Sequence, residues 1–335
     1  MPFSWIYAKI ICARNRLYDL GIFDSFNLGA KTISIGNITA GGTGKTPLTA
    51  YVAEILAERG ELVCILTRGY GRQDPKKRVL VSDRERILAG PGEAGDEPFE
   101  LAQSLLGKAL VIADADRVSA AEWARRKFGV TAFVLDDSFQ HRRVKRDVDI
   151  VCIDATDPFG GGKMLPAGRL REPVANLKRA DIVIITRADL TDDISDLRSD
   201  IAELSHESAV FEAKNKITGV VSFEEFAANN GKPCADQVGS PAFAFCGIGN
   251  PESFFKQLRL EKFCVNASHT FRDHHTYTQT DINEITRQAK ESGSQLLLTT
   301  AKDAVKLTGL KFEIPCYVVK IRTAVSDETA FAALL

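Results

Sequence analysis

A glycine-rich stretch at residues 32–47, TISIGNITAGGTGKTP, carries the clearest chemistry in this chain. An apolar, β-branched run leads into a loop, and Lys45 and Thr46 open a helix. Glycines let backbone N–H groups point at an anion, and the helix N-terminus adds partial positive charge, so this arrangement is typical of a loop that wraps a polyphosphate. The spacing matches G-x-x-x-x-G-K-[ST] except that Thr39 stands at the first glycine position. The alternative is a glycine-rich turn that binds nothing.

In the first interpretation, the loop and the first helical turn hold a nucleoside triphosphate. The Lys45 ammonium would reach the β- and γ-phosphates, and the Thr46 hydroxyl would bind Mg²⁺. The candidate nucleotide-binding residues are Thr39, Gly41, Gly42, Thr43, Gly44, Lys45 and Thr46.

A second polar run, LDDSFQHRR at 135–143, follows a β-branched segment. An apolar strand that ends in aspartate is the arrangement in which a carboxylate holds Mg²⁺ or its water, so Asp136 is a candidate metal ligand together with Thr46. The run contains more polar side chains than a turn needs. Its arginines form either a solvated face or a site for an anion.

Other candidate residues lie in loops that follow predicted strands, where the ligand crevice of a parallel sheet is lined. Arg68 lies in a glycine-rich loop that is either a substrate contact or a plain surface loop. Asp96 opens a predicted helix at 97–106, where an aspartate commonly serves only as an N-cap. Arg171 follows a glycine-rich loop and would bind a phosphate through its guanidinium fork. Residues 186–189, TRAD, only weakly match the [NT]-K-x-D loop that reads guanine in GTPases.

The order of predicted elements indicates the fold class. Strands and helices alternate as far as about residue 208, which predicts an α/β, P-loop NTPase-like fold with a doubly wound parallel sheet. Within the chain we also predict an irregular insertion at 74–93, a helix at 174–180 and a strand at 263–265. A second, smaller α/β domain follows, and its loop at 271–277 carries Asp273, His274 and His275. The predicted divisions are an N-terminal helix region at 1–30, a core domain at 31–208, a strand-rich linker at 209–241 and a C-terminal domain at 242–335.

The N-terminal segment 3–26 is predicted to form an amphipathic helix. Its apolar stripe has basic residues beside it and aromatic residues near the start, as in helices that lie in a membrane interface. The alternative is a helix that packs its stripe on its own domain. The stripe consists of Phe3, Ile6, Ile10, Ala13, Leu17 and Leu20.

Composition excludes several classes of protein. The 335 residues are 44% hydrophobic and 26% charged with a net charge of −1, which argues against bulk nucleic-acid binding. The seven cysteines form no C-x-x-C pair, so we expect buried free thiols in a reducing compartment rather than disulfides or a zinc site. We expect no cleavable signal peptide and no membrane-spanning segment.

Taken together, these motifs resemble those of the tetraacyldisaccharide 4′-kinases, the lipid A 4′-kinases of Gram-negative bacteria. The resemblance runs nearly end to end. Two departures are Ser138, where glycine is expected, and Arg169, where the family often has proline. The matching motifs are GNIT and GGTGKTP within 36–47, RGYG at 68–71, GDEP at 95–98, LDD at 135–137, FQHR at 139–142, LPAG at 165–168, LREP at 170–173 and DHH at 273–275.

The resemblance implies transfer of the ATP γ-phosphate, with Mg²⁺, to the 4′-hydroxyl of an acylated disaccharide 1-phosphate. It makes Asp96 the candidate base and His274 its support, in a second domain expected to close over the site. Asp137 is a further catalytic candidate, and the proton path among these three stays open. The candidate substrate contacts are Arg68, Gln140, His141, Arg142 and Arg171. The resemblance also favours peripheral binding of the N-terminal helix to the cytoplasmic face of the inner membrane, with no nucleic acid and no obligate protein partner.

Two other functions fit parts of the sequence. A P-loop GTPase or metallochaperone-type NTPase would use the same loop as a switch. A membrane-associated adaptor would bind ATP without catalysis. Nucleotide preference and lipid-dependent ATP turnover distinguish these possibilities from a lipid kinase.

Overall fold

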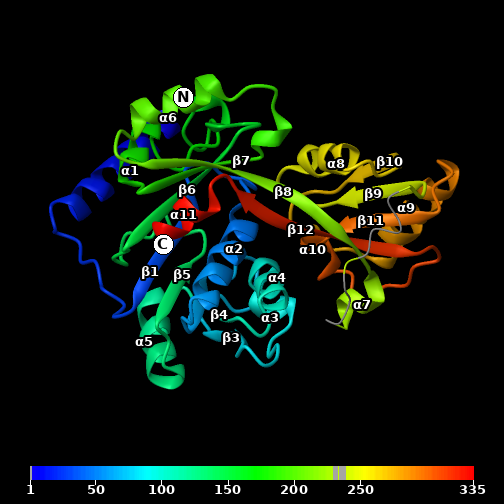
Figure 1. Cartoon of the computed structure of the whole chain (residues 1–335), viewed down its shortest axis with the longest axis horizontal. Coiled ribbons are helices and arrows are strands. Elements are labelled where there is room, and N and C mark those ends of the chain that lie inside the picture. Colours follow the sequence, from blue (N-terminus) through cyan, green and yellow to red (C-terminus); the bar gives the residue numbers. More distant parts are fainter. Residues whose placement is uncertain (1, 229–232, 234–238) are drawn as a thin grey trace. The chain divides into compact units, whose positions relative to one another are not determined.

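The chain in the computed structural model falls into two compact units (Figure 1). The structure describes residues 2–228, 233 and 239–335. The first unit comprises Met1–Lys214 and Thr323–Leu335, and the second comprises Asn215–Arg322. Each unit contains both strands and helices, and the strands at 209–222 and 316–325 each contribute residues to both units.

The first unit is built on a mostly parallel sheet in the order β8-β7-β6-β1-β5-β2-β4-β3, with only β3 antiparallel to its neighbour. The residues of its inner strands are almost all buried, as expected for a parallel sheet covered on both faces. The strands are β1 (Lys31–Asn37), β2 (Val63–Thr67), β3 (Val79–Ser82), β4 (Ala109–Ala113), β5 (Ala132–Leu135), β6 (Val148–Asp154), β7 (Ile182–Thr186) and β8 (Ala209–Ser222).

Helices pack on both faces of this sheet. Leu48 of α2 and Leu101 of α4 belong to one apolar cluster. Ala120 of α5 and Ile201 of α6 belong to two further clusters, which contain different residues of the same strands. The helical elements are α1 (Pro2–Asp19), α2 (Lys45–Glu58), α3 (Pro91–Ala94), α4 (Asp96–Ser104), α5 (Arg117–Phe128), η1 (Gly160–Gly162), η2 (Val174–Arg179), η3 (Ala188–Leu190), α6 (Ser195–Leu204) and α11 (Glu328–Ala333).

This topology places two loops next to each other. Strand β1 lies between β6 and β5, so the glycine-rich loop after β1 is adjacent to the acidic run after β5. Parallel strands end at the same edge of a sheet, and ligands bind outside those carboxyl ends. The two motifs with the clearest predicted chemistry therefore come from neighbouring strands.

The second unit has a parallel sheet in the order β10-β9-β11-β12. Phe255 and Leu258 of α8 pack on strand residues such as Ala244 and Leu298. Its elements are α7 (Phe223–Ala227), β9 (Ala242–Cys246), α8 (Pro251–Leu260), β10 (Val265–Thr270), α9 (Gln279–Glu291), β11 (Leu296–Thr300), α10 (Ala301–Ala304) and β12 (Cys316–Val325).

The structure confirms the α/β fold class and corrects several predicted elements. The segment at 74–93, predicted to be irregular, contains β3 and α3, and the strand predicted at 263–265 instead begins at Val265. The segment at 174–180, predicted to be a helix, contains a 3₁₀ helix. These short elements lack the long hydrophobic period that makes elements recognisable in sequence.

The predicted domain limits also differ from the observed units. Residues 209–222 form the long strand β8, which agrees with the strand-rich character predicted for 209–241, and the first unit extends to Lys214. The C-terminal helix α11 belongs to the first unit, because Phe331 stacks on Tyr51 with ring centroids 6.1 Å apart. Part of the predicted linker, 229–232 and 234–238, lies outside the described residues.

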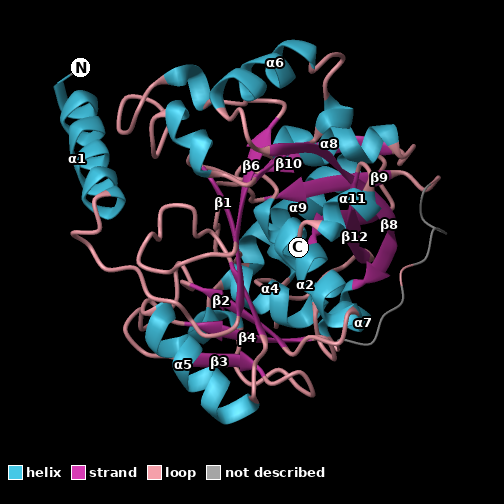
Figure 2. Cartoon of the chain, turned by 60° about the vertical axis from the view of Figure 1, so that its left-hand side comes forward, coloured by secondary structure: helices cyan, strands magenta, loops and turns pink. Residues whose placement is uncertain are grey.

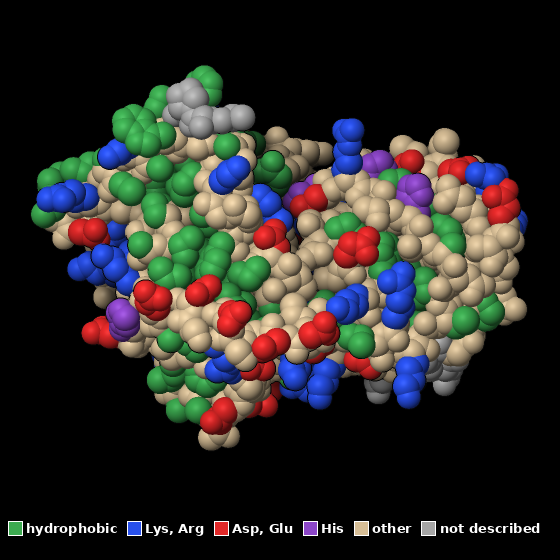
Figure 3. Space-filling model, turned by 90° about the horizontal axis from the view of Figure 1, so that it is seen from above, with side chains coloured by type: hydrophobic (Ala, Val, Ile, Leu, Met, Phe, Trp, Pro, Cys, Tyr) green, Lys and Arg blue, Asp and Glu red, His purple; other side chains and the backbone are tan. Residues whose placement is uncertain are grey.

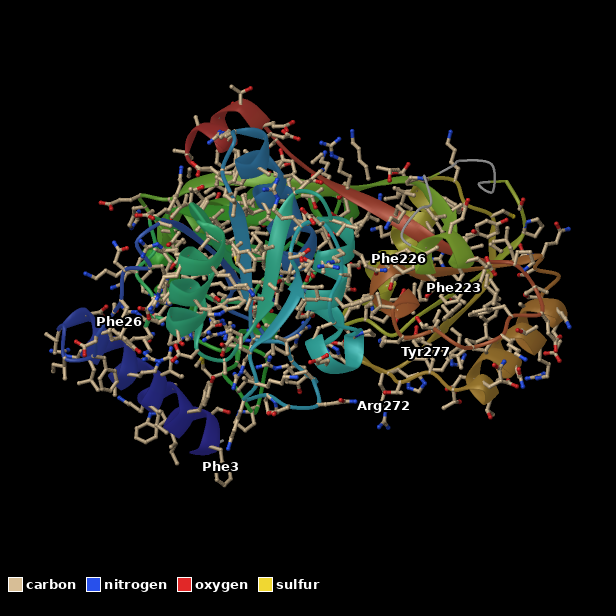
Figure 4. All side chains as sticks on the ribbon, turned by 90° about the horizontal axis from the view of Figure 1, so that it is seen from below. Phe3, Phe26, Phe223, Phe226, Arg272 and Tyr277 are labelled. Carbon is tan, nitrogen blue, oxygen red and sulfur yellow. The ribbon has the colours of Figure 1, made fainter. Side chains whose placement is uncertain are left out.

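Helix α1 does not pack its apolar stripe on its own unit. Phe3 is 71% exposed and Ile10 is 59% exposed, whereas Ile11 and Asn15, on the other side, are buried. In Figure 2 α1 lies at the outside of the first unit, and in Figure 4 the labelled Phe3 points away from it. Apolar side chains form green patches on this unit in Figure 3. The helix thus packs a mixed side with Ile11 and Asn15 on its unit and leaves apolar residues such as Phe3 and Ile10 exposed.

Most described cysteines are buried, as predicted. Cys64, Cys152, Cys246 and Cys316 are buried in strands, and all six described cysteines are free thiols. Cys12 and Cys264 are exposed, so the expectation does not hold for these two. Cys234 lies outside the described residues.

Candidate active site

The loop between β1 and α2 has the backbone conformation that its glycines permit. Gly41 has φ +116° and Gly44 has φ +78°, both in the left-handed region that favours glycine. A Cβ at Gly41 would lie 2.4 Å from Arg169 Nη2, so a side chain there would displace the end of the Arg169 side chain. Gly44 is the N-cap of α2 and has no side chain to cap it. Helix N–H groups that no side chain caps suit an anion.

Hydrogen bonds from neighbouring segments fix the shape of this loop. The Thr186 hydroxyl donates to the Thr43 carbonyl at 2.9 Å, and Arg187 donates to the Gly42 carbonyl at 2.9 Å. Asn37 Nδ2 donates to Thr43 Oγ1 at 2.9 Å. The end of β1 and the segment that follows β7 therefore hold this loop. Thr186 and Arg187 belong to the weak guanine-reading motif, and here their side chains hold the P-loop backbone.

A compact charge cluster lies beside the loop. Lys45 Nζ is 3.4 Å from Asp137 Oδ1, and Arg171 Nη1 is 2.8 and 3.0 Å from the two Asp137 oxygens. Burial acts to raise the pKa of Asp137, but Lys45 and Arg171 outweigh it and the pKa is lowered. A carboxylate with a lowered pKa is a weak proton acceptor. The cluster therefore favours a role for Asp137 in placing the two cations rather than as a general base.

Asp136, the neighbouring carboxylate, has a different environment. It is 1% exposed and accepts hydrogen bonds from Thr49 Oγ1 at 3.0 Å and Thr67 Oγ1 at 3.4 Å. Burial, followed by the charges of Glu97 and Asp137, raises its pKa to about 7. A cation brought near this carboxylate would favour its ionised form. Both hydrogen bonds that Asp136 accepts within the described part of the chain thus come from neutral hydroxyl groups.

Asp96 is the first residue of α4, and the N-cap is Gly95. The alternative interpretation, in which Asp96 serves only as the N-cap of this helix, is therefore wrong. The backbone of Gly95 approaches the 68–71 loop closely, because a Cβ there would lie 2.8 Å from the Tyr70 carbonyl oxygen. Glu97, the next residue, acts on the pKa of Asp136, so the first turn of α4 lies within electrostatic range of the end of β5. Arg68 is exposed in that loop.

The remaining predicted substrate residues have separate environments. Gln140 Nε2 donates to the Asn37 carbonyl at the end of β1, at 2.8 Å. Burial and the charges of Arg117, Arg146 and Arg143 lower the pKa of His141 to about 4, so this imidazole is neutral. Arg142 instead holds α1, since it donates to the Asn15 carbonyl at 2.8 Å and to Asp19 at 2.7 Å.

Sequence reasoning missed Arg117, the first residue of α5. It is 4% exposed, and burial lowers its pKa to about 10 despite the opposing charge of Asp136. Arg117 interacts electrostatically with Asp136, Arg68 and Asp137, so it is a third cation near the aspartates that follow β5, besides Lys45 and Arg171. Its position directly after β4, at the carboxyl end of a parallel strand, was the available signal.

The DHH motif lies in the second unit, in the loop after β10. His274 has φ +60°, and its Nε2 is 3.4 Å from Lys302 Nζ. His275 is held elsewhere, 3.2 Å from Asp281 Oδ2 at the start of α9. The two adjacent histidines therefore have different partners: His274 contacts a lysine, and His275 contacts an aspartate.

Two further properties follow from the described residues. None of the helices in the described part of the chain has the length and apolar character needed to cross a membrane. No group of three or more His, Cys, Asp or Glu side chains in that part is arranged to hold a metal ion by itself. Mg²⁺ at a nucleotide site commonly uses one or two protein oxygens and takes the rest from phosphates and water.

A loop of this conformation, a lysine at the start of the helix that follows it and a buried aspartate directly after the neighbouring strand β5 define a P-loop nucleotide-binding fold. The model of the tetraacyldisaccharide-1-P 4′-kinase family matches residues 1–335, and the chain belongs to this family.

Individual relatives agree with that assignment. A tetraacyldisaccharide 4′-kinase of Halothermothrix orenii is 39% identical over 312 residues, covering 90% of this chain and 81% of the relative. One from Desulfotalea psychrophila is 36% identical, covering 98% of this chain and 92% of the relative. A crystal structure of the "apo" form of LpxK from Aquifex aeolicus in complex with ATP is similar with a TM-score of 0.78 and 30% identity, over 99% of this chain and 96% of that one.

Proposed function

We propose that this protein transfers the γ-phosphate of ATP to the 4′-hydroxyl of an acylated disaccharide 1-phosphate, a precursor of lipid A. The observation that carries the proposal is the Lys45–Asp137–Arg171 cluster beside a P-loop, in a chain of the 4′-kinase family. Phosphoryl transfer has a loose transition state, so placed positive charge and alignment supply most of the acceleration. The cluster holds two cations on one carboxylate, which leaves net positive charge for phosphate oxygens.

The residues of the first unit would hold the nucleotide. The loop residues 39–46 would bind the phosphates through backbone N–H groups, and Lys45 would contact the transferred group. Thr46 and Asp136 would hold Mg²⁺, which neutralises phosphate charge when bound. The donor set fits that ion, because it offers a hydroxyl and a buried carboxylate that is not already neutralised by a hydrogen-bonded cation.

The acceptor hydroxyl must lose a proton during the transfer. We propose Asp96 as the base and His274 as a second participant in proton transfer, on the strength of the family motif that contains each. Asp137 is disfavoured as the base by its lowered pKa. Arg68, Gln140 and His141 remain candidates for contacts with the lipid head, whereas the observed contacts of Arg142 are those of a helix anchor.

The acceptor is a lipid, and α1 suits binding to a membrane surface from one side. Its exposed apolar side chains include Phe3, Trp5 and Ile6. An amphipathic helix with such a face lies in the membrane interface. On its other side, the Tyr7 hydroxyl donates to the Arg171 carbonyl at 3.1 Å and Asn15 donates to Glu172 at 2.9 Å. The proposed membrane-binding helix is thus joined to the segment that carries Arg171.

One experiment distinguishes the proposed lipid kinase from a GTPase switch and from an adaptor that binds ATP without catalysis. Purified protein is given ATP or GTP with Mg²⁺, with and without tetraacyldisaccharide 1-phosphate in mixed micelles, and nucleoside diphosphate is measured. We expect ADP formation that depends on the lipid and a preference for ATP over GTP. Lipid-independent GTP hydrolysis would support the switch, and ATP binding without turnover would support the adaptor.

A further inference from the structure

Lys302 and Asp303 form a short motif that the proposed function leaves without a role. They lie in α10, directly after β11 of the second unit. Asp303 is fully buried, and Lys302 has 15% of its side chain exposed. Two adjacent charged residues that are this buried need partners, because an uncompensated buried charge is costly.

The partners of Asp303 come from the loops around it. Its carboxylate accepts hydrogen bonds from the Gly247 N–H at 3.0 Å, the Tyr277 hydroxyl at 3.0 Å and the Thr300 hydroxyl at 2.7 Å. Lys306 Nζ lies 3.3 Å from the same carboxylate. Asp303 therefore joins the loop after β9 to the loop after β10.

Gly247 links Asp303 to His274. Its N–H donates to Asp303, and its carbonyl accepts from the His274 N–H at 3.3 Å. A Cβ at this position would lie 2.9 Å from the Arg272 carbonyl oxygen and 3.2 Å from Tyr277 Oη. Figure 4 labels Arg272 and Tyr277, which flank the His274 turn. One peptide group thus fits tightly between the buried carboxylate and the turn.

The turn needs such support because His274 adopts a left-handed backbone conformation, φ +60°. Residues other than glycine adopt this conformation at a cost and keep it when the surroundings determine it. The surroundings of this turn include the hydrogen bonds of the His274 N–H to the Gly247 carbonyl at 3.3 Å and to Asp273 Oδ1 at 3.1 Å, and the contact of the ring with Lys302.

Lys302 acts on the imidazole ring itself. Its Nζ lies 3.4 Å from His274 Nε2 and 3.1 Å from Asp273 Oδ1. An ammonium group has donors only, so the nitrogen that accepts from it carries no proton. The contact therefore selects the form of His274 in which Nε2 has its lone pair available, and Asp273 balances the lysine charge.

We propose that Lys302 and Asp303 are positioning residues for His274. Asp303 fixes the backbone of the turn through the Gly247 peptide, and Lys302 fixes the orientation and tautomer of the ring. The inference rests on the proposed function, because the position of His274 affects catalysis only if His274 takes part in phosphoryl transfer.

The test is a double-mutant cycle on the full-length protein. Lys302→Met is expected to lower kcat about tenfold with little change in KM for ATP or lipid, as for residues that orient a functional imidazole. Lys302→Arg should recover part of the loss. In a His274→Ala background, Lys302→Met should have no further effect. An equal loss in both backgrounds, or no loss in either, would overturn the proposal.

Gly247→Ala tests the Asp303 branch without removing a buried charge. It should lower kcat in the wild-type background and not in His274→Ala, since the added methyl group displaces the turn. A loss of equal size in both backgrounds would mean that Gly247 serves stability alone. Lys290→Met is the matched control, because Lys290 forms an exposed pair with Glu313 in the same unit, and it should leave kcat unchanged.

A second readout does not depend on turnover. The ¹⁵N shifts of the His274 ring should show an unprotonated Nε2 in the wild-type protein and a changed tautomer balance in Lys302→Met. Identical ring shifts in the two proteins would overturn the role of Lys302. If the wild-type protein transfers no phosphate to lipid, the proposed function fails, and the ring shifts still decide whether Lys302 sets the tautomer.

Discussion

Each unit of this protein places a lysine beside an aspartate, and a third residue makes the two groups different. In the first unit, Lys45 and Arg171 share Asp137, so the cluster has net positive charge. In the second unit, Lys302 and Asp273 balance each other next to His274. Excess positive charge suits a polyphosphate, whereas a balanced pair beside an imidazole suits a proton. The two groups therefore differ in the chemistry that they suit.

The largest effect should come from the cation of the first cluster. Lys45→Met removes the charge nearest to the transferred phosphate, and we expect kcat to fall by about 10³-fold or more in a lipid phosphorylation assay. Lys108→Met, which breaks an exposed pair with Glu54 in the same unit, is the control and should keep wild-type activity. A loss of kcat smaller than tenfold in Lys45→Met would mean that the first cluster does not stabilise the transferred phosphate.

Arg171 tests what the third residue of the first cluster does. Because it holds both oxygens of Asp137, Arg171→Ala should lower kcat by about 10- to 100-fold and leave KM for lipid within about threefold. Initial rates at varied lipid concentration separate the two parameters. A rise in KM for lipid with unchanged kcat would assign Arg171 to the lipid 1-phosphate instead, as the sequence first indicated.

The exposed side of α1 should affect binding to phospholipid vesicles more than it affects the rate of phosphoryl transfer. Replacing Phe3, Ile6 and Ile10 by serine removes apolar area from this face, and we expect binding to anionic phospholipid vesicles to weaken about tenfold or more. Co-sedimentation measures this, with Cys12→Ser on the same helix as the control. Turnover of detergent-dispersed lipid should stay within about threefold. Unchanged vesicle binding would contradict the membrane role of α1.

The smallest effect should be a pH-dependent difference in thermal stability between the wild-type protein and Asp136→Asn. Its pKa in the folded protein, about 7, is above that of an unfolded aspartate, so the folded state binds the extra proton. Wild-type stability should therefore fall as pH rises from about 4 to 7, whereas Asp136→Asn lacks this loss. In buffer without nucleotide or metal, we expect the variant to gain roughly 2–5 °C in Tm relative to wild type between pH 4 and 8. A constant difference would contradict the raised pKa.

The sequence predicted the parts of the site that depend on backbone conformation and local pattern. Gly41 and Gly44 have left-handed backbones that the glycine pattern indicates, and α2 begins at Lys45 as predicted. The strand before Asp136 was predicted from its β-branched run and is confirmed.

Other parts could not be predicted because they depend on long-range packing. The pairing of Arg171 with Asp137 joins residues 34 positions apart, and the link from Asp303 to Gly247 joins residues 56 positions apart. Neither has a local signal. The buried environment of Arg117 and the return of α11 to the first unit depend on the tertiary arrangement in the same way.

The position of the new phosphate on the lipid decides whether this protein is a 4′-kinase. Wild-type protein is incubated with ATP, Mg²⁺ and tetraacyldisaccharide 1-phosphate, and the product is analysed by ³¹P and ¹H NMR and mass spectrometry. We predict one added phosphate at the 4′-oxygen, formed in equal amount with ADP and absent in Lys45→Met. ADP formation at the same rate without lipid, or a product that lacks phosphate at the 4′-position, would contradict the account.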